Sequence, residues 1–199
     1  MNKIKKILIG THNDGKFKEL SYLLSKKIIK LSPKKLKIKS PNETGKTFLS
    51  NSKLKANYFY KYSNIPSISD DSGITIKCLG GKPGIYSARW AKKYGSFNKA
   101  MKKILKLVAH KNKKINNYGA QFICSLTIKI SNKKSISAVG KIDGNISKKI
   151  LGKNGFGYDS IFIPKGQKIT FGQMSKRKKI LMDHRFIAFT KLKNKIKVL

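Results

Sequence analysis

Hydrophobic residues recur along this chain with two different periods, which predict β-strands and α-helices in alternation. The first segment, 4–9, ends in three consecutive apolar residues before Gly10 and is predicted as a buried strand. Apolar residues at helical spacing then predict helices at 16–29, 47–62, 97–108 and 186–195. Further strands are predicted at 36–39, 65–69, 74–77, 118–130, 133–141 and 161–163, the two longest forming a hairpin around Ser131 and Asn132.

This mixed order of strands and helices predicts an α/β protein with a mixed sheet. At 199 residues the chain is long enough for one sizeable core, or for two small lobes that share one. No internal repeat and no linker rich in proline, glycine or serine divides the sequence. We therefore expect a single domain over residues 1–199.

The composition argues against a membrane protein and against a disulfide-rich secreted one. No apolar run approaches the length that spans a membrane, and the apolar stretch behind the basic N-terminus is too short for a signal peptide. Cys78 and Cys124 are too few and too isolated for a disulfide framework or a zinc site. These features predict a reduced, cytoplasmic protein with no membrane partner.

The formal net charge is +38, from 46 basic and 8 acidic residues. Such a charge is typical of nucleic-acid binding, because phosphate backbones attract basic side chains. The alternative is a mutational bias toward lysine, which we favour because lysine is spread over the whole chain and asparagine and isoleucine are also abundant. Arginine, which grips phosphate through two donors, occurs only at Arg89, Arg177 and Arg185. We therefore expect no specific nucleic-acid partner.

Asp70 and Asp71 stand side by side in a chain that is poor in acidic residues. Adjacent carboxylates raise each other's pKa unless a positive group lies near them. Oxygen ligands of this kind suit magnesium, so a bound divalent cation is the usual reason for such a pair. The pair therefore indicates an enzyme that handles phosphate with the help of a metal ion.

The segment 10–17 has the spacing of a phosphate-binding P-loop except at its last position. That position requires Ser or Thr to place a hydroxyl on magnesium, and Phe17 has none. The segment still precedes a predicted helix, whose N-terminal amides bind anions, and Lys16 adds a positive charge. The alternative is a plain strand-to-helix turn capped by Asn13 or Asp14, and the spacing alone leaves both open.

Two glycine-rich segments and a loop also carry candidate chemistry, each with a plainer alternative. Glu43 could hold the same cation as Asp71, or it could belong to a loop before a helix that Thr47 caps. The segment 80–89 could let the backbone approach a ligand, or form a long turn. The segment 155–159 could stack an aromatic ring on a base, or form a turn with partly buried rings.

The basic residues near the C-terminus are equally ambiguous on their own. The run 176–179 could be a binding patch, but a solvated run of charge is the commoner case. His184 and Arg185 open the last predicted helix, where they could grip an anionic or carbonyl-bearing ligand. A single histidine is more often structural.

Taken in order, these segments resemble the inosine triphosphate pyrophosphatase family, whose members hydrolyse non-canonical purine nucleoside triphosphates. The resemblance covers nearly the whole chain. Each matching segment is weak alone, and their conserved order makes the match specific. The matching parts are 11–19, 43–51, 70–73, 83–89 and 155–159, together with Lys179, His184 and Arg185.

The resemblance implies a long twisted mixed β-sheet flanked by helices, with two lobes and a nucleotide cleft between them. It implies hydrolysis of ITP, dITP or XTP to the monophosphate and pyrophosphate by one nucleoside-triphosphate pyrophosphatase domain. Such an activity removes deaminated purines from the nucleotide pool. The implied cofactor is Mg²⁺, the implied partner is the purine nucleoside triphosphate, and the implied assembly is a homodimer.

The resemblance also assigns roles by position. Asp71 would accept the proton of the attacking water, and Glu43 and Asp71 would hold magnesium, with Asp70 beside them. Buried donors that recognise the base would favour a 6-keto purine over adenine, because a donor left unpaired costs binding energy. The substrate contacts implied are Thr11, His12, Asn13, Asp14, Gly15, Lys16, Ser72, Phe156, Gly157, Tyr158, Asp159, Lys179, His184 and Arg185.

Three positions depart from the pattern of the family. Ser160 stands where proline usually follows, Gln173 replaces a common glutamate, and Asp183 replaces a common serine. Asp183 places a negative charge beside the base-recognition pair, which bears on substrate preference more than on the reaction. The competing hypotheses are an RNA-binding protein and a related pyrophosphatase for pyrimidine or modified bases.

Overall fold

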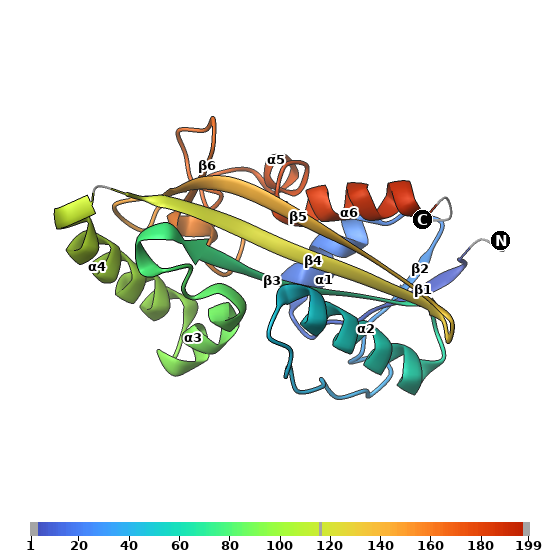
Figure 1. Cartoon of the computed structure of the whole chain (residues 1–199). Helices are drawn as coiled ribbons and strands as arrows, with labels where there is room; N and C mark the ends of the chain where they lie inside the picture. Colours follow the sequence, from blue (N-terminus) through green and yellow to red (C-terminus); the bar gives the residue numbers. More distant parts are fainter. Residues whose placement is uncertain (1–3, 116, 197–199) are drawn as a thin grey trace. The chain divides into compact units, whose positions relative to one another are not determined.

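The computed structural model describes residues 4–115 and 117–196. Among the described residues the strands form one six-stranded sheet in the order β2-β1-β3-β4-β5-β6 (Figure 1). β1 pairs in parallel with β2 and β3, whereas β5 pairs antiparallel with β6, so the sheet is mixed as predicted. The strands are β1 (Lys6–Ile9), β2 (Ile29–Leu31), β3 (Ser67–Ile76), β4 (Gly119–Ser131), β5 (Lys134–Ile146) and β6 (Phe162–Pro164).

Helices alternate with these strands along the chain, which confirms the predicted α/β class. The α-helices are α1 (Asp14–Leu23), α2 (Phe48–Ser63), α3 (Ser87–Lys93), α4 (Phe97–Ile115), α5 (Lys176–Ile180) and α6 (His184–Lys195). Short 3₁₀ turns follow or precede some of them, at η1 (Lys77–Leu79), η2 (Gly84–Tyr86) and η3 (Asp159–Ile161). None of the described helices is long and apolar enough to cross a membrane.

Two predicted elements near the N-terminus were wrong in extent or kind. The helix expected at 16–29 ends at Leu23, and its last predicted residue opens β2. The apolar spacing continued because Leu24 and Ile28 still contact the same core after the helix has ended. The strand expected at 36–39 is instead part of a turn, in which Lys37 has φ of 54° and cannot extend.

The central strand was predicted in two pieces and is one. β3 runs without a break through Asp70 and Asp71, where the sequence had suggested a strand on either side of the acidic pair. The sequence pattern suggested a break at the two acids because unpaired carboxylates are costly to bury within a strand. The hairpin of β4 and β5 is confirmed, with the second strand continuing to Ile146. The short helices α3 and α5 were not predicted.

The chain forms two compact units, and the first consists of Met1–Asp71, Cys124–Gly140 and Arg185–Leu199. Its strands present alternate residues to two faces. Ile7 and Ile9 pack on one face with α1 and α6, through residues that include Leu20 and Phe189. Leu8 packs on the opposite face, against Phe59 of α2. Helices therefore cover both faces of the parallel strands in this unit.

The second unit consists of Ser72–Ile123 and Lys141–His184. Ile74 and Ile76 at the end of β3 pack with α4 in its core, through residues such as Ile104. Phe122 of β4 lies 4.7 Å from Phe162 of β6 between ring centroids, at an angle of 67°. The expectation of one domain over 1–199, and that of a nucleotide cleft, stay predictions.

Candidate active site

The segment between β1 and α1 is a tight capped turn. The side chain of Asn13 caps α1 by accepting a hydrogen bond from the Lys16 amide at 3.0 Å. The Asn13 amide in turn donates to the Thr11 hydroxyl at 3.1 Å. The capped turn that the sequence left open is therefore present. The cap occupies one amide of the first helical turn. The helix end keeps its positive dipole, so the turn remains compatible with anion binding.

The other predicted residues of this turn point to different partners. The His12 ring is hydrogen-bonded through Nδ1 to the Ser40 hydroxyl at 2.6 Å. Asp14 forms a surface ion pair with Lys34 at 3.4 Å and is 76% exposed in its side chain. Lys16 reaches inward, and its Nζ lies 3.1 Å from Oδ2 of Asp70.

Asp70 is a buried anion held by two cations. Nη2 of Arg185 donates to Oδ2 of Asp70 at 3.0 Å, and Lys16 contacts the same oxygen. Burial alone would raise the pKa of Asp70, but the charges of Lys16, Arg185 and Lys55 hold that pKa far below its usual range. Asp70 is therefore ionised at any working pH, and its contacts fix the neighbouring Asp71 in place.

Arg185 bridges two acids. Its other terminal nitrogen, Nη1, donates to Glu19 of α1, and its side chain is 1% exposed. The sequence had grouped Arg185 with Lys179 and His184 as recognising the base. In the structure its guanidinium contacts Glu19 and Asp70, in the first unit, and its role in base recognition stays a prediction.

Asp71 is a buried carboxylate with polar neighbours at both of its oxygens. Nδ2 of Asn51 donates to its Oδ2 at 3.0 Å, and Nζ of Lys55 lies 3.9 Å from its Oδ1. The pKa of Asp71 is raised, mainly by burial and further by the charge of Glu43, although the charges of Lys55 and Lys16 and the hydrogen bond from Asn51 lower it. A carboxylate with a raised pKa accepts a proton more readily than an ordinary aspartate.

Glu43 and Asp71 both lie near one positive group, the ammonium of Lys55. Nζ of Lys55 lies 2.6 Å from Oε1 of Glu43, in addition to its contact with Asp71. The charges of Asp70, Asp71 and Glu43 raise the pKa of Lys55 although burial lowers it, so Lys55 carries its proton. Both carboxylates therefore face the same positive charge.

The loop that carries Glu43 is tied to the same site. Thr47 caps α2 in a reciprocal capping box with Ser50, which confirms the predicted cap. Oδ1 of Asn51 accepts from the Gly45 amide at 2.8 Å, while its amide nitrogen binds Asp71. Asn51 therefore joins the loop to the strand.

A magnesium ion fits this donor set. Magnesium is commonly held by one or two carboxylates, with water and substrate phosphate completing its six ligands. Glu43 and Asp71 supply such a pair. Within the described residues, no group of three or more histidine, cysteine, aspartate or glutamate side chains is placed to hold a metal ion alone. The pair therefore suits a metal shared with phosphate.

Sequence reasoning gave no role to three residues of this site. Asn51 and Glu19 lay inside the matching segments, so their polar side chains on otherwise amphipathic helices were a usable signal. Lys55 gave no such signal, because it is one of a great many lysines.

The candidate base-recognition residues gather in the second unit. Nζ of Lys179 lies 2.8 Å from Oδ2 of Asp159 and 4.6 Å from the centroid of the Phe156 ring. The same oxygen of Asp159 accepts from the Phe156 amide at 2.8 Å. Gly155 is required here, because it has φ of +76° and a Cβ would lie 2.2 Å from that oxygen. The turn 155–159 is thus built around one buried ion pair.

The two aromatic rings of this turn differ in role. Tyr158 is buried, donates its hydroxyl to the Ser87 carbonyl at 2.8 Å and packs edge-on against Phe97. Burial, with the charge of Tyr94, raises the pKa of Tyr158 above its usual range. Phe156 is half-buried, as is Gly157, so Phe156 is the ring of the pair that can reach a ligand.

The remaining predicted residues and the departures have clear positions. His184 stacks on Phe122, with ring centroids 4.7 Å apart and planes at 10°. Ser72 lies half-buried in β3, directly after Asp71. Asp183 is buried, with Oδ2 3.8 Å from Nζ of Lys179. Gln173 accepts from the Thr170 amide at 3.1 Å, as a glutamate could.

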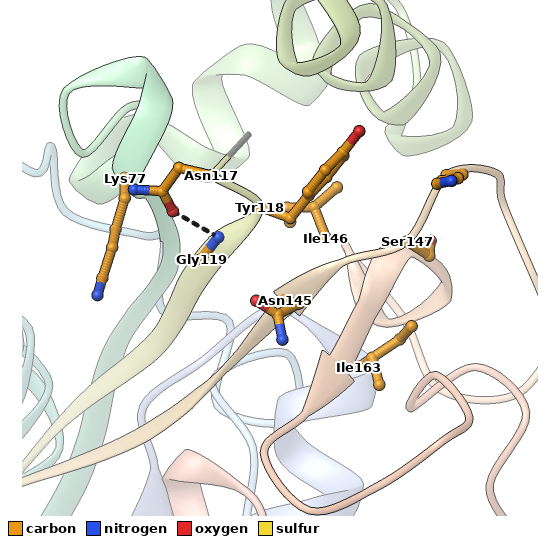
Figure 2. A pocket seen from close by; sticks show the side chains of 9 residues that line it. Lys77, Asn117, Tyr118, Gly119, Asn145, Ile146, Ser147 and Ile163 are labelled. Atoms are coloured by element: carbon orange, nitrogen blue, oxygen red, sulfur yellow. Dashed lines mark hydrogen bonds between the residues drawn. The ribbon is translucent and has the colours of Figure 1, made fainter. Parts of the chain in front are cut away.

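A separate hollow of about 640 Å³ opens in the second unit, at the start of β4 and the end of β5. Figure 2 shows it, with the Asn117 side chain accepting from the Gly119 amide beside it. No residue that the sequence predicted for the site appears among the described residues of its wall. Those are Lys77, Asn117, Tyr118, Gly119, Asn145, Ile146, Ser147, Lys148 and Ile163.

Known proteins resemble this chain over nearly its full length. The model of the Ham1 family matches residues 7–195. The chain is 37% identical to a dITP/XTP pyrophosphatase of Caulobacter vibrioides, covering 94% of this chain and 96% of that protein. It is 38% identical to a dITP/XTP pyrophosphatase of Haemophilus influenzae, covering 96% of this chain and 99% of that protein.

Solved structures agree with this similarity. A HAM1 protein from Coxiella burnetii superposes with a TM-score of 0.87 at 27% identity, covering 98% of this chain and 99% of that one. The Ham1 protein of Staphylococcus aureus gives a TM-score of 0.83 at 31% identity, with 97% and 98% covered.

Proposed function

This chain belongs to the Ham1 family, and from that premise we propose that it hydrolyses deaminated purine nucleoside triphosphates, namely dITP, ITP and XTP, to the monophosphate and pyrophosphate. The observation that carries the proposal is that Glu43 and Asp71 both lie near one ammonium, that of Lys55. An activity of this kind removes deaminated purines before a polymerase can use them.

The first unit supplies the groups that bind phosphate. The turn of Thr11 and Asn13 sets the N-terminus of α1, whose amides and dipole attract anions. Lys16 lies at the same end of the helix and contributes its charge. The large positive charge of the chain attracts a polyanionic substrate to the protein as a whole.

Glu43 and Asp71 are the residues that would hold magnesium. When bound there, the ion offsets the charge of phosphate oxygens and orients them. Asn51 holds Oδ2 of Asp71 and the loop of Glu43 in one arrangement, so the two carboxylates are positioned before substrate arrives. Preorganised charge of this kind supplies much of the rate in phosphoryl transfer.

Asp71 accepts a proton from the attacking water in this mechanism. Burial raises the pKa of Asp71 in the metal-free protein, whereas its neighbour Asp70 stays ionised under the charges of Lys16 and Arg185. The two adjacent acids therefore have different roles. Asp70 forms ion pairs that link β3 to its neighbours, and Asp71 accepts the proton.

The second unit supplies the residues that recognise the base. Phe156 offers a ring for stacking, and Lys179 offers a buried ammonium that can donate to a keto oxygen at C6. An amino group at that position would leave the donor unpaired, which costs binding energy. We retain a homodimer and a cytoplasmic location as predictions.

Pyrophosphate release tests this proposal. Purified protein with Mg²⁺ is assayed on dITP, ITP, XTP, GTP and ATP, with Glu43→Gln as a control for contaminating activity. We expect the deaminated purines to be preferred by kcat/KM, by at least about tenfold. Equal rates on all substrates would overturn the base preference, and no release by folded protein would overturn the proposal.

A further inference from the structure

Lys55 occupies the centre of the Glu43–Asp71 pair. Its Nζ lies 2.6 Å from Oε1 of Glu43 and 3.9 Å from Oδ1 of Asp71, and its side chain is 12% exposed. The first contact is as short as a charge-assisted hydrogen bond becomes. This ammonium therefore lies where the two carboxylates converge.

The position of Lys55 follows from the geometry of α2. Asn51 and Lys55 are four residues apart, so they project from the same face of the helix. Asn51 takes Oδ2 of Asp71, while Lys55 faces Oδ1. One face of α2 thus contacts both oxygens of the Asp71 carboxylate, with the side-chain amide of Asn51 at one and the ammonium of Lys55 near the other.

We infer that Lys55 is a resident counter-cation, which holds Glu43 and Asp71 together and which a divalent cation displaces when it binds the pair. This inference rests on the proposed function, because it takes Glu43 and Asp71 as the metal-holding residues. Lys55 then acts as a positioning residue that sets the affinity of the site for metal.

The distances require an exchange. A magnesium ion sits about 2.1 Å from each oxygen that holds it. Oε1 of Glu43 lies 2.6 Å from the ammonium of Lys55, so an ion bound to this oxygen would lie beside the ammonium. Two cations cannot both lie so close to one oxygen in a partly buried site without strong repulsion. The ammonium therefore leaves Glu43 as the metal arrives.

The arrangement also gives the site a stable form without metal. Two carboxylates facing each other would repel and spread the Glu43 loop away from β3. With Lys55 between them, the acids stay in place, and the metal enters a formed site. The consequence is a weaker apparent affinity for Mg²⁺ than the same carboxylates would have without the lysine.

Binding of Mg²⁺ alone tests the inference. The dissociation constant is measured by calorimetry, with MgCl₂ and no nucleotide, for wild type, Lys55→Met and Lys53→Met. Lys53 is a matched control, because it is an exposed lysine on the same helix and its loss changes the net charge equally. We expect Lys55→Met to bind Mg²⁺ about tenfold tighter than wild type, which equals about 1.4 kcal/mol, and Lys53→Met to be unchanged.

A second measurement uses the unaltered protein. Mass spectrometry follows the reaction of each lysine with an amine-selective reagent as MgCl₂ is added. Labelling of Lys55 should increase with Mg²⁺ while that of Lys53 stays constant, and this result does not depend on whether Lys55→Met folds.

The outcomes separate this inference from the proposed function. If wild type binds Mg²⁺ but Lys55→Met binds it equally or more weakly, with no increase in Lys55 labelling, the counter-cation role is overturned and the metal site stands. If neither protein binds Mg²⁺ in the absence of nucleotide, the counter-cation inference is overturned, and the metal-assisted function is then tested separately by the Mg²⁺ dependence of pyrophosphate release.

Discussion

The guanidinium of Arg185 donates a hydrogen bond to Asp70 at 3.0 Å, although the two residues are 115 positions apart in the sequence. The same side chain also bonds Glu19. It therefore ties α6 to both α1 and β3, next to the residue that we propose as the base. Arg185, which the resemblance to the family assigns to base recognition, thus also contacts Asp70 of the acidic pair.

Replacing Arg185 should lower the free energy of unfolding. Arg185→Met leaves Glu19 and Asp70 buried with less compensating charge, and breaking a buried ion pair costs about 3–5 kcal/mol. Arg185→Lys keeps a charge but cannot bridge both acids, so it should lose less. Chemical denaturation gives the free energy of unfolding for each. A loss below about 1 kcal/mol in Arg185→Met would show that the network carries little stability.

Because of Asp70, the free energy of unfolding should decrease at acidic pH. Its pKa in the folded protein is lower than the value of 3.8 for a free aspartate, so the unfolded chain takes up a proton first. The stability it contributes is therefore fully present above about pH 4 and is lost as the pH falls below that value. The difference in unfolding free energy between wild type and Asp70→Asn should shrink from pH 6 to pH 3.

The control for this prediction is Asp14→Asn. Asp14 is 76% exposed and pairs with Lys34 only at the surface, so its replacement should leave the acid dependence unchanged. A constant difference between wild type and Asp70→Asn over the same range would contradict the buried network.

The two aromatic residues of the 155–159 turn should respond differently to substitution. Phe156→Ala removes the half-buried ring, and stacking on a base is worth about 1–3 kcal/mol, so KM for dITP should increase roughly 5- to 150-fold. Tyr158→Phe removes the hydroxyl bonded to Ser87, which should cost about 1 kcal/mol of stability with KM unchanged. A large increase in KM for Tyr158→Phe, with none for Phe156→Ala, would contradict these assignments and make Tyr158 the residue that binds the base.

Asp183 should weaken the preference for deaminated bases. Its carboxylate lies 3.8 Å from the ammonium of Lys179, which also pairs with Asp159 at 2.8 Å. Asp183→Ser removes one of these acceptors, so Lys179 should donate more readily to a keto oxygen. We expect the ratio of kcat/KM for dITP over dATP to increase several-fold, and a decrease would contradict this role.

The sequence predicted the class of the fold, whereas the roles of its site residues stay predictions. The acidic pair was marked by its charge in a chain poor in acids, but Glu43 and the Asn13 turn were weak signals alone and were assigned through the resemblance to the family. The pattern also predicted the long β4–β5 hairpin, since its apolar residues alternate over many positions. Local periodicity missed the continuity of β3 and placed a strand at 36–39, because tertiary contacts decide both.

The rest of the site depends on contacts between distant positions. No local pattern distinguishes Lys55 from the other lysines of the chain, and only the fold brings it to Glu43 and Asp71. The same is true of Arg185, whose neighbour His184 stacks on Phe122 while its own side chain turns to Glu19 and Asp70. Adjacent residues thus serve separate clusters.

Asp71→Asn tests the central claim most directly, through the rate of pyrophosphate release from dITP with Mg²⁺ together with the unfolding temperature. The raised pKa of Asp71 means that its charge is disfavoured in the folded protein, so stability is lost as the pH rises through that pKa. The asparagine should therefore leave the unfolding temperature at pH 7 unchanged or higher. Activity should fall roughly 10²- to 10⁴-fold, as expected for loss of a general base. Activity close to that of wild type in this folded variant would contradict the account.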